Sequence, residues 1–167
     1  RCDHVRYLDC YIFAPTKGLR APSSDAIDID ACHDVLVNGC YMNVNDDAVA
    51  IKGGKGTWAD QVPENGPVYN VLIQNCEYGK VHGCLTLGSE SVNDRNIILR
   101  NIKVGNAQRV LWLKMRPDTP QHYEYVTVDN IQGNVGSFLV VRPWTQFFNL
   151  GDRKDMPLSQ CNNITMK

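Results

Sequence analysis

This chain of 167 residues lacks a strong charge imbalance and lacks long apolar runs. It carries 17 Lys and Arg against 18 Asp and Glu, a formal net charge of -1, so nothing in its composition favours nucleic acid or an anionic membrane surface as partner. No apolar run approaches the roughly 20 residues of a membrane-spanning helix. At this length we expect one domain, residues 1–167, with its own hydrophobic core.

Helical periodicity is also nearly absent. Short runs with alternating apolar and polar residues dominate instead, and Gly, Asn, Asp and Pro bound them. The seven cysteines include no C-x-x-C pair, the spacing typical of zinc sites. The sequence therefore predicts an all-β chain without a cysteine-based metal site.

An internal repeat organises these short runs. Five segments align as "HVRYLDC", "DVLVNGC", "NVLIQNC", "NIILRNI" and "YVTVDNI", and "NITMK" begins a sixth. Their first apolar residues are Val5, Val35, Val71, Ile97 and Val126. A second set interleaves with the first: "DAIDID", "DAVAIK", "GCLTLG", "RVLWLK" and "FLVVRP".

Two short strands recurring in each unit predict a parallel β-helix, in which equivalent residues of successive coils stack about 4.8 Å apart. A β-sandwich also has many short strands, but it has no reason to repeat a residue at the same offset in successive units. We expect about five coils. Neither terminus resembles a cap, so the chain is expected to be part of a longer solenoid.

The repeat also assigns the cysteines to columns. Cys10, Cys40 and Cys76 share one offset, and a second column holds Cys2, Cys32 and Cys161. Small, soft side chains stack well inside a solenoid. We interpret both columns as core packing, with a Cys2–Cys32 or Cys10–Cys40 disulfide left open.

The second strand set aligns chemically active residues. Asp25 stands one coil before Asp47, and His82 stands beside Asp46 on the next coil. Alone, "NDD" is an ordinary turn composition; the common register is what favours a site. Glycoside hydrolysis needs one protonated and one ionised carboxyl group, and crowded carboxylates raise the pKa of one of them. The alignment therefore predicts a glycoside hydrolase site.

Four short motifs carry a family resemblance. They read "SSD" (23–25), "NDD" (45–47), "VHG" (81–83) and "WLK" (112–114). They resemble the Asn-Thr-Asp, Gly-Asp-Asp, Gly-His-Gly and Arg-Ile-Lys motifs of the polygalacturonase family, glycoside hydrolase family 28, bacterial members especially. The resemblance covers roughly residues 22–131. It implies a right-handed parallel β-helix and an inverting hydrolase of pectic polysaccharide, secreted or periplasmic, without a metal or organic cofactor.

The resemblance also implies roles for individual residues. Asp46 would be the general acid, and Asp25 and Asp47 would hold and deprotonate the attacking water. His82 would assist Asp46, and Lys114 would bind a substrate carboxylate. Inversion in this family fits carboxylates far enough apart to admit a water molecule.

Departures from the motifs bear on the substrate. Trp112 replaces the motif arginine; an indole cannot make the two-point contact of a guanidinium with a carboxylate, but it can stack on a sugar. We therefore expect a pectic substrate other than bare polygalacturonate, such as rhamnogalacturonan or decorated pectin. Trp112 could instead be a surface aromatic packed by a loop. In the Gly- and Pro-containing insertion after Lys52, Trp58 is the expected sugar contact, unless that loop only covers the sheet edge.

Two other functions remain open. A calcium-dependent pectate lyase would use the aspartates as ligands and an arginine as base, although His82 and Lys114 argue against a bound cation. A non-catalytic solenoid that binds glycans would not need the aspartates. The expected partner of the hydrolase is a pectic glycan, with neither nucleic acid nor membrane. The exact glycan, endo or exo action and the oligomeric state are left open.

Overall fold

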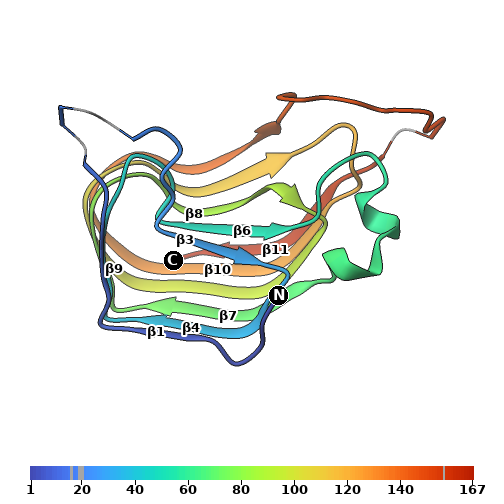
Figure 1. The fold of residues 1–167 in the computed structure, drawn as a ribbon. Coiled ribbons are helices and arrows are strands. Elements are labelled where there is room, and N and C mark those ends of the chain that lie inside the picture. Colours follow the sequence, from blue (N-terminus) through green and yellow to red (C-terminus); the bar gives the residue numbers. More distant parts are fainter. Residues whose placement is uncertain (16, 19–20, 156) are drawn as a thin grey trace.

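The computed structural model describes residues 1–15, 17–18, 21–155 and 157–167. The chain winds into stacked coils that form a parallel β-helix (Figure 1). Each strand pairing among these residues is parallel. The predicted solenoid architecture is therefore confirmed, and a sandwich of antiparallel strands is excluded.

The coils have three faces, named here in the order in which the chain first meets them. The first face contains β1 (Arg6–Leu8), β4 (His33–Asn38), β7 (Val68–Gln74), the starts of β9 (Asn93–Met115) and β10 (His122–Pro143), and β11 (Gln160–Met166). The second contains β2 (Tyr11–Phe13), β5 (Tyr41–Asn43), the start of β8 (Glu77–Ser91) and the middle of β9 and β10. The third contains β3 (Ile27–Asp30), β6 (Val49–Gly53) and the ends of β8, β9 and β10.

The register follows the predicted repeat. On the first face the paired residues run through Val35, Val71, Ile97, Val126 and Ile164. On the third face they run through Ile27, Val49, Leu85, Leu111 and Leu139. The two strand sets found in the sequence are therefore the first and third faces, whereas the second face was not predicted.

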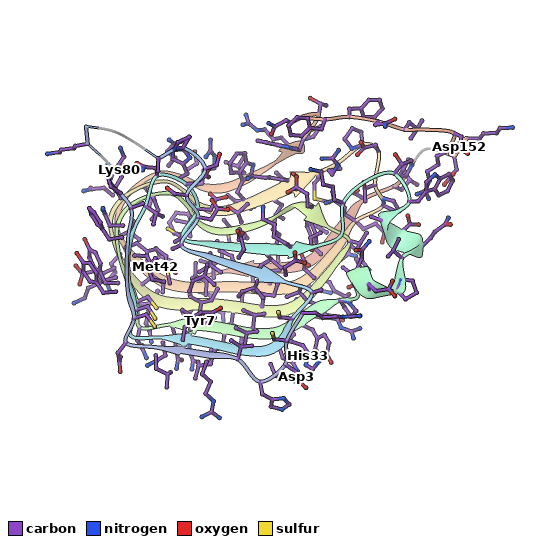
Figure 2. All side chains as sticks on the ribbon, viewed as in Figure 1. Asp3, Tyr7, His33, Met42, Lys80 and Asp152 are labelled. Carbon is purple, nitrogen blue, oxygen red and sulfur yellow. The ribbon has the colours of Figure 1, made fainter. Side chains whose placement is uncertain are left out.

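Apolar columns fill the interior of the coils, as Figure 2 shows, with Met42 among them. The predicted column of Cys10, Cys40 and Cys76 packs in or against this core, and all seven cysteines are free thiols. Burial raises the pKa of Cys76 to about 11, so this thiol stays protonated near neutral pH. Neither disulfide that the sequence left open is present.

A polar ladder runs along the first face, immediately before the apolar anchors of β4, β7 and β9. Asp34, Asn70 and Asn96 have φ near +55°, a left-handed conformation that Asn and Asp tolerate better than other non-glycine residues. Asn70 Nδ2 donates to Asp34 Oδ1 at 2.8 Å, and Asn96 Nδ2 donates to Asn70 Oδ1 at 2.7 Å. Asn or Asp precedes four of the six apolar anchors, and this recurrence thus has a backbone cause.

The insertion after β6 contains two short 3₁₀ turns, η1 (Ala59–Gln61) and η2 (Pro63–Asn65), at the right of Figure 1. It is bonded to the segment that follows β10. Arg153 Nη1 donates to Thr57 O at 2.9 Å, and Trp58 Nε1 donates to Asp152 Oδ1 at 3.1 Å. The described part of the chain has no helix with the length and apolar character to span a membrane.

Candidate active site

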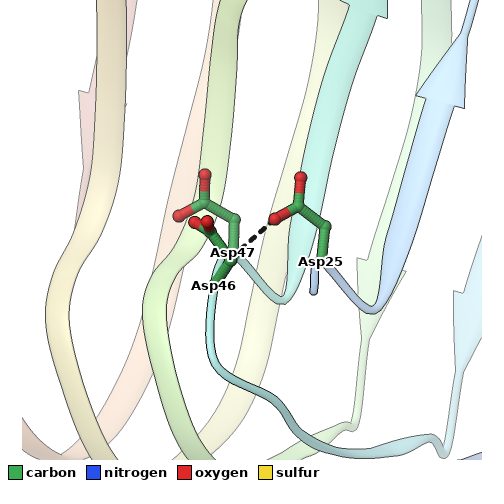
Figure 3. Close-up of side chains that lie close together, drawn as sticks. All are labelled: Asp25, Asp46 and Asp47. Atoms are coloured by element: carbon green, nitrogen blue, oxygen red, sulfur yellow. Dashed lines mark hydrogen bonds between the residues drawn. The ribbon is translucent and has the colours of Figure 1, made fainter. Parts of the chain in front are cut away.

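Three carboxylates gather where β3 and β6 begin. Asp25 precedes β3, and Asp46 and Asp47 lie in the turn before β6. One carboxylate oxygen from each residue lies within 4.8 Å of the others (Figure 3). The backbone N–H of Asp47 donates to Asp25 Oδ1 at 3.2 Å, and that of Ala26 donates to Asp47 O at 3.0 Å. The predicted register therefore brings these three residues together.

Asp47 is the most buried of the three, with 1% of its surface exposed. Lys114 Nζ lies 3.3 Å from its Oδ2, whereas Oδ1 has no hydrogen-bond partner among the described residues. A Cβ atom at Gly83 would lie 2.7 Å from that Oδ1, so glycine at this position leaves room for the carboxylate. Lys114, predicted to bind a substrate carboxylate, is already in contact with a carboxylate of the protein.

Asp46 and His82 lie next to each other on adjacent coils. His82 Nδ1 is 3.4 Å from Asp46 Oδ1, and the backbone N–H of His82 donates to Asp46 O at 2.9 Å. Both side chains are about a quarter exposed and line the same cleft. An imidazole beside a carboxyl group can support the charge changes of an acid–base step.

The pKa of Asp25 is strongly raised. Burial raises the pKa of Asp25 to about 7, and the charges of Asp28, Asp46 and Asp47 add to this effect. The positive charge of Lys52 opposes it. Near neutral pH Asp25 is therefore protonated in a substantial fraction of the molecules.

Asp25 and Asp46 open onto a cleft of about 390 Å³ along the third face, and the buried Asp47 lies beside them. Among the described residues its lining combines acidic, basic, amide, hydroxyl and indole side chains: Ser23, Asp25, Asp46, Lys52, His82, Ser89, Glu90, Gln108, Arg109, Trp112, Lys114, Trp144 and Gln146. Sequence reasoning gave no role to Arg109, Trp144 or Glu90. Arg109 could have been found, because it shares the register of Gly83 on the coil beside it.

Trp112 differs from its prediction. It was expected to present its indole to a sugar, but only 5% of its surface is exposed. The Arg109 guanidinium carbon lies 3.8 Å from the ring centroid, and the Trp144 ring packs edge-on at 5.3 Å. β10 and the segment that follows it cover the Trp112 indole. This arrangement fits the alternative prediction of an aromatic residue packed by a loop.

Trp58 is not brought to the carboxylates. It is 40% exposed, its Nε1 is bonded to Asp152, and the Arg153 guanidinium lies 5.0 Å from its ring centroid. It is absent from the described residues that line the cleft. The insertion follows the end of β6, whereas the carboxylates precede its start. This arrangement fits the alternative of a loop that covers the sheet edge.

The carboxylate cluster fits a divalent cation poorly. Oxygen ligands of this kind suit Ca²⁺, and the three aspartates are close enough to share an ion. However, the ammonium group of Lys114 already balances Asp47 at 3.3 Å. A cation in the cluster would lie close to that positive charge, which disfavours a calcium-dependent lyase mechanism.

Comparisons with known proteins agree with the fold and the motifs. The sequence model of Glycosyl hydrolases family 28 matches residues 1–137. A probable polygalacturonase of Arabidopsis thaliana is 24% identical over 157 residues, which make up 90% of this chain and 30% of that protein.

Two solved structures share the right-handed parallel β-helix fold. A hyperthermoactive exopolygalacturonase from Thermotoga maritima superposes with a TM-score of 0.61 and 20% identity, over 86% of this chain and 32% of that one. A polygalacturonase from Erwinia carotovora ssp. carotovora has a TM-score of 0.56 and 18% identity, over 99% of this chain and 50% of that one. The chain thus spans half or less of the length of these relatives, and by its sequence and fold it belongs to glycosyl hydrolase family 28.

Proposed function

We propose that this chain carries the catalytic centre of a hydrolase that cleaves pectic polysaccharide. The observation that carries the proposal is the gathering of Asp25, Asp46 and Asp47 within 4.8 Å, at a cleft that His82 also lines. Pectic polymers lie outside the cell, so the whole protein would act in the periplasm or the exterior.

In the proposed reaction Asp46 donates a proton to the glycosidic oxygen, because it lies at the cleft with His82 at its side. Asp47, whose Oδ2 lies 3.3 Å from Lys114 Nζ, acts with Asp25 to orient the attacking water and accept its proton. The proton that Asp25 holds in the free chain must be on Asp46 when the linkage breaks. The short distances within the cluster support such a transfer through one water molecule.

The carboxylates are closer together than expected. Inverting glycosidases commonly separate their two carboxyl groups by about 6.5–9.5 Å, whereas the nearest oxygens here lie within 4.8 Å of one another. We therefore propose that the attacking water lies beside Asp25 and Asp47 rather than between two widely separated groups. We propose inversion on this arrangement, with the stereochemistry of the product as its direct test.

Galacturonan is the substrate that we propose. Trp112 in place of arginine was the reason to expect a different pectic glycan, but its indole is buried and Arg109 supplies a guanidinium at the same place. Rhamnogalacturonan and decorated pectin remain the alternatives, and hydrolysis of a panel of pectic glycans separates the three.

Asp46→Asn tests the proposed acid. The substitution keeps the size of the side chain and removes its proton, so turnover should fall by about 10²–10⁴-fold while the fold is unchanged. Asp129→Asn, on β10 outside the cleft, is the matched control. Full activity in Asp46→Asn would reject the assignment. Loss of activity with a chelator, or an unsaturated product absorbing in the ultraviolet, would instead favour the lyase.

A further inference from the structure

The sequence departs from the family motif at Trp112, and the structure shows what lies around that residue. Three cations lie near the Trp112 ring centroid: the guanidinium carbon of Arg109 at 3.8 Å, Lys114 Nζ at 4.2 Å and the guanidinium carbon of Arg142 at 5.5 Å. The indole face attracts cations and fixes the plane of a guanidinium that stacks on it. Trp112 itself cannot bind a carboxylate, but its indole ring orients cationic side chains that can.

Arg109 differs from the other sequestered arginines of the molecule. Arg116 pairs with Asp118 at 2.8 Å, and Arg153 pairs with Asp60 at 3.0 Å. Arg109 and Arg142 form no ion pair with any described residue. The chain otherwise places a carboxylate beside a sheltered guanidinium, so Arg109 lacks the counter-charge that this environment calls for.

The electrostatics of Arg109 support this reading. Burial lowers its pKa, and the positive charge of Arg142 lowers it further, while the negative charges of Asp47 and Asp46 oppose the shift. Two guanidinium groups on one indole repel each other. A bound anion would relieve that repulsion and would offset the desolvation of Arg109.

The position of Arg109 identifies the class of anion. It lines the cleft that holds Asp25 and Asp46, and it pairs in register with Gly83, at which a Cβ atom would lie 2.7 Å from Asp47 Oδ1. Two of the described lysine and arginine side chains that line the cleft are already paired: Lys114 with Asp47 at 3.3 Å and Lys52 with Glu90 at 3.4 Å. The third, Arg109, has no carboxylate partner among the described residues and can bind an anionic ligand.

We propose that Arg109, stacked on Trp112 and backed by Arg142, binds the carboxylate of a uronic acid residue next to the cleaved linkage. The inference rests on the proposed function. The guanidinium that grips the substrate is thus supplied three residues before the place where the family motif has it. Arg109 discriminates a free uronate carboxylate from its methyl ester, whereas Lys114 balances the negative charge of Asp47.

Paired substrates test this inference. With the full-length protein, kcat/KM is measured on trigalacturonate and on its methyl ester for the wild type, Arg109→Gln and Arg109→Lys. Loss of a charge-assisted hydrogen bond should lower kcat/KM of Arg109→Gln about 10- to 100-fold on the acid, with little change on the ester. Arg109→Lys should recover part of the loss. Arg100→Gln is the matched control, because its guanidinium is on the same strand and bonded to Gln74.

Equal losses on the two substrates, or no loss on the acid, would overturn the inference. Calorimetric titration with trigalacturonate distinguishes its failure from that of the proposed function. If the wild type binds but cleaves neither substrate, the proposed function fails, while weaker binding of the acid by Arg109→Gln would still support the assignment. Binding that is equal in wild type and Arg109→Gln, or absent in both, would reject it.

Discussion

A carboxyl group inside the coils gives a prediction that can be worked out in free energy. Asp94, at the start of β9, has no exposed surface and stacks between Val68 and Tyr123 of the neighbouring coils. Ser91 Oγ donates to its Oδ1 at 2.5 Å, and its Oδ2 has no hydrogen-bond partner among the described residues. Burial raises the pKa of Asp94 to about 7, and the Ser91 hydrogen bond opposes the shift.

The sign of the effect on stability follows from this raised pKa. In the unfolded chain the pKa of Asp94 is near the ordinary aspartate value of 3.8, whereas in the folded chain it is about 7. The protonated form therefore favours folding at low pH, and this contribution is lost as the pH rises from about 4 to about 7. A shift of about three pKa units corresponds to about 4 kcal/mol of unfolding free energy.

Asp94→Asn removes the titration and keeps the shape. Relative to the wild type, its unfolding free energy should rise by about 4 kcal/mol between about pH 4 and about pH 8. At the acidic end it should be lower by about 1 kcal/mol, because the new amide has an unpaired N–H. Urea denaturation followed by tryptophan fluorescence gives these values.

Asp30→Asn, at an exposed position on β3, is the control for removing a carboxylate. The difference between this control and the wild type should stay nearly constant over the same pH range. A difference between Asp94→Asn and the wild type that is equally flat would refute the reasoning, since it would show that Asp94 titrates alike in both states.

Two further predictions concern the site and its surroundings. Gly83→Ala should lower kcat by about 10²-fold, because its Cβ would lie 2.7 Å from Asp47 Oδ1 and displace that carboxylate. Gly105→Ala is the control: its Cβ would lie 2.7 Å from a backbone oxygen outside the cleft, so it should lower stability but leave kcat unchanged. Trp58→Ala should leave KM within about threefold and lower the unfolding free energy by about 1 kcal/mol, because it loses the bond to Asp152. A tenfold rise in KM would restore Trp58 as a sugar contact.

The repeat in the sequence predicted the first and third faces of the solenoid and missed the second face. The first and third faces have apolar anchors at fixed offsets, and the structure pairs them as predicted. On the second face β2 and β5 have three residues each, too few for an alternating pattern to be recognised. The stacked column of Cys10, Cys40 and Cys76 was the available signal, since it marks the turn into that face.

The carboxylate cluster was predictable because register alone places Asp25 beside Asp47. The cluster around Trp112 was not. Strand parity places Trp112 on the outer side of the coil, but its burial depends on contact with Trp144. The backbone N–H of Trp144 donates to Met115 O at 2.7 Å, and this bond brings the segment after β10 back over the cleft. Contacts made by such an irregular segment leave no periodic trace in the sequence.

The central claim is that the register of the coils makes a site in which water attacks a glycosidic linkage. The measurement that tests it most directly is proton NMR of the first product released when the full-length protein acts on galacturonan oligosaccharides. We predict a saturated product of inverted anomeric configuration. A product of retained configuration would show that a carboxylate, not water, attacks the sugar, and an unsaturated product would contradict hydrolysis itself.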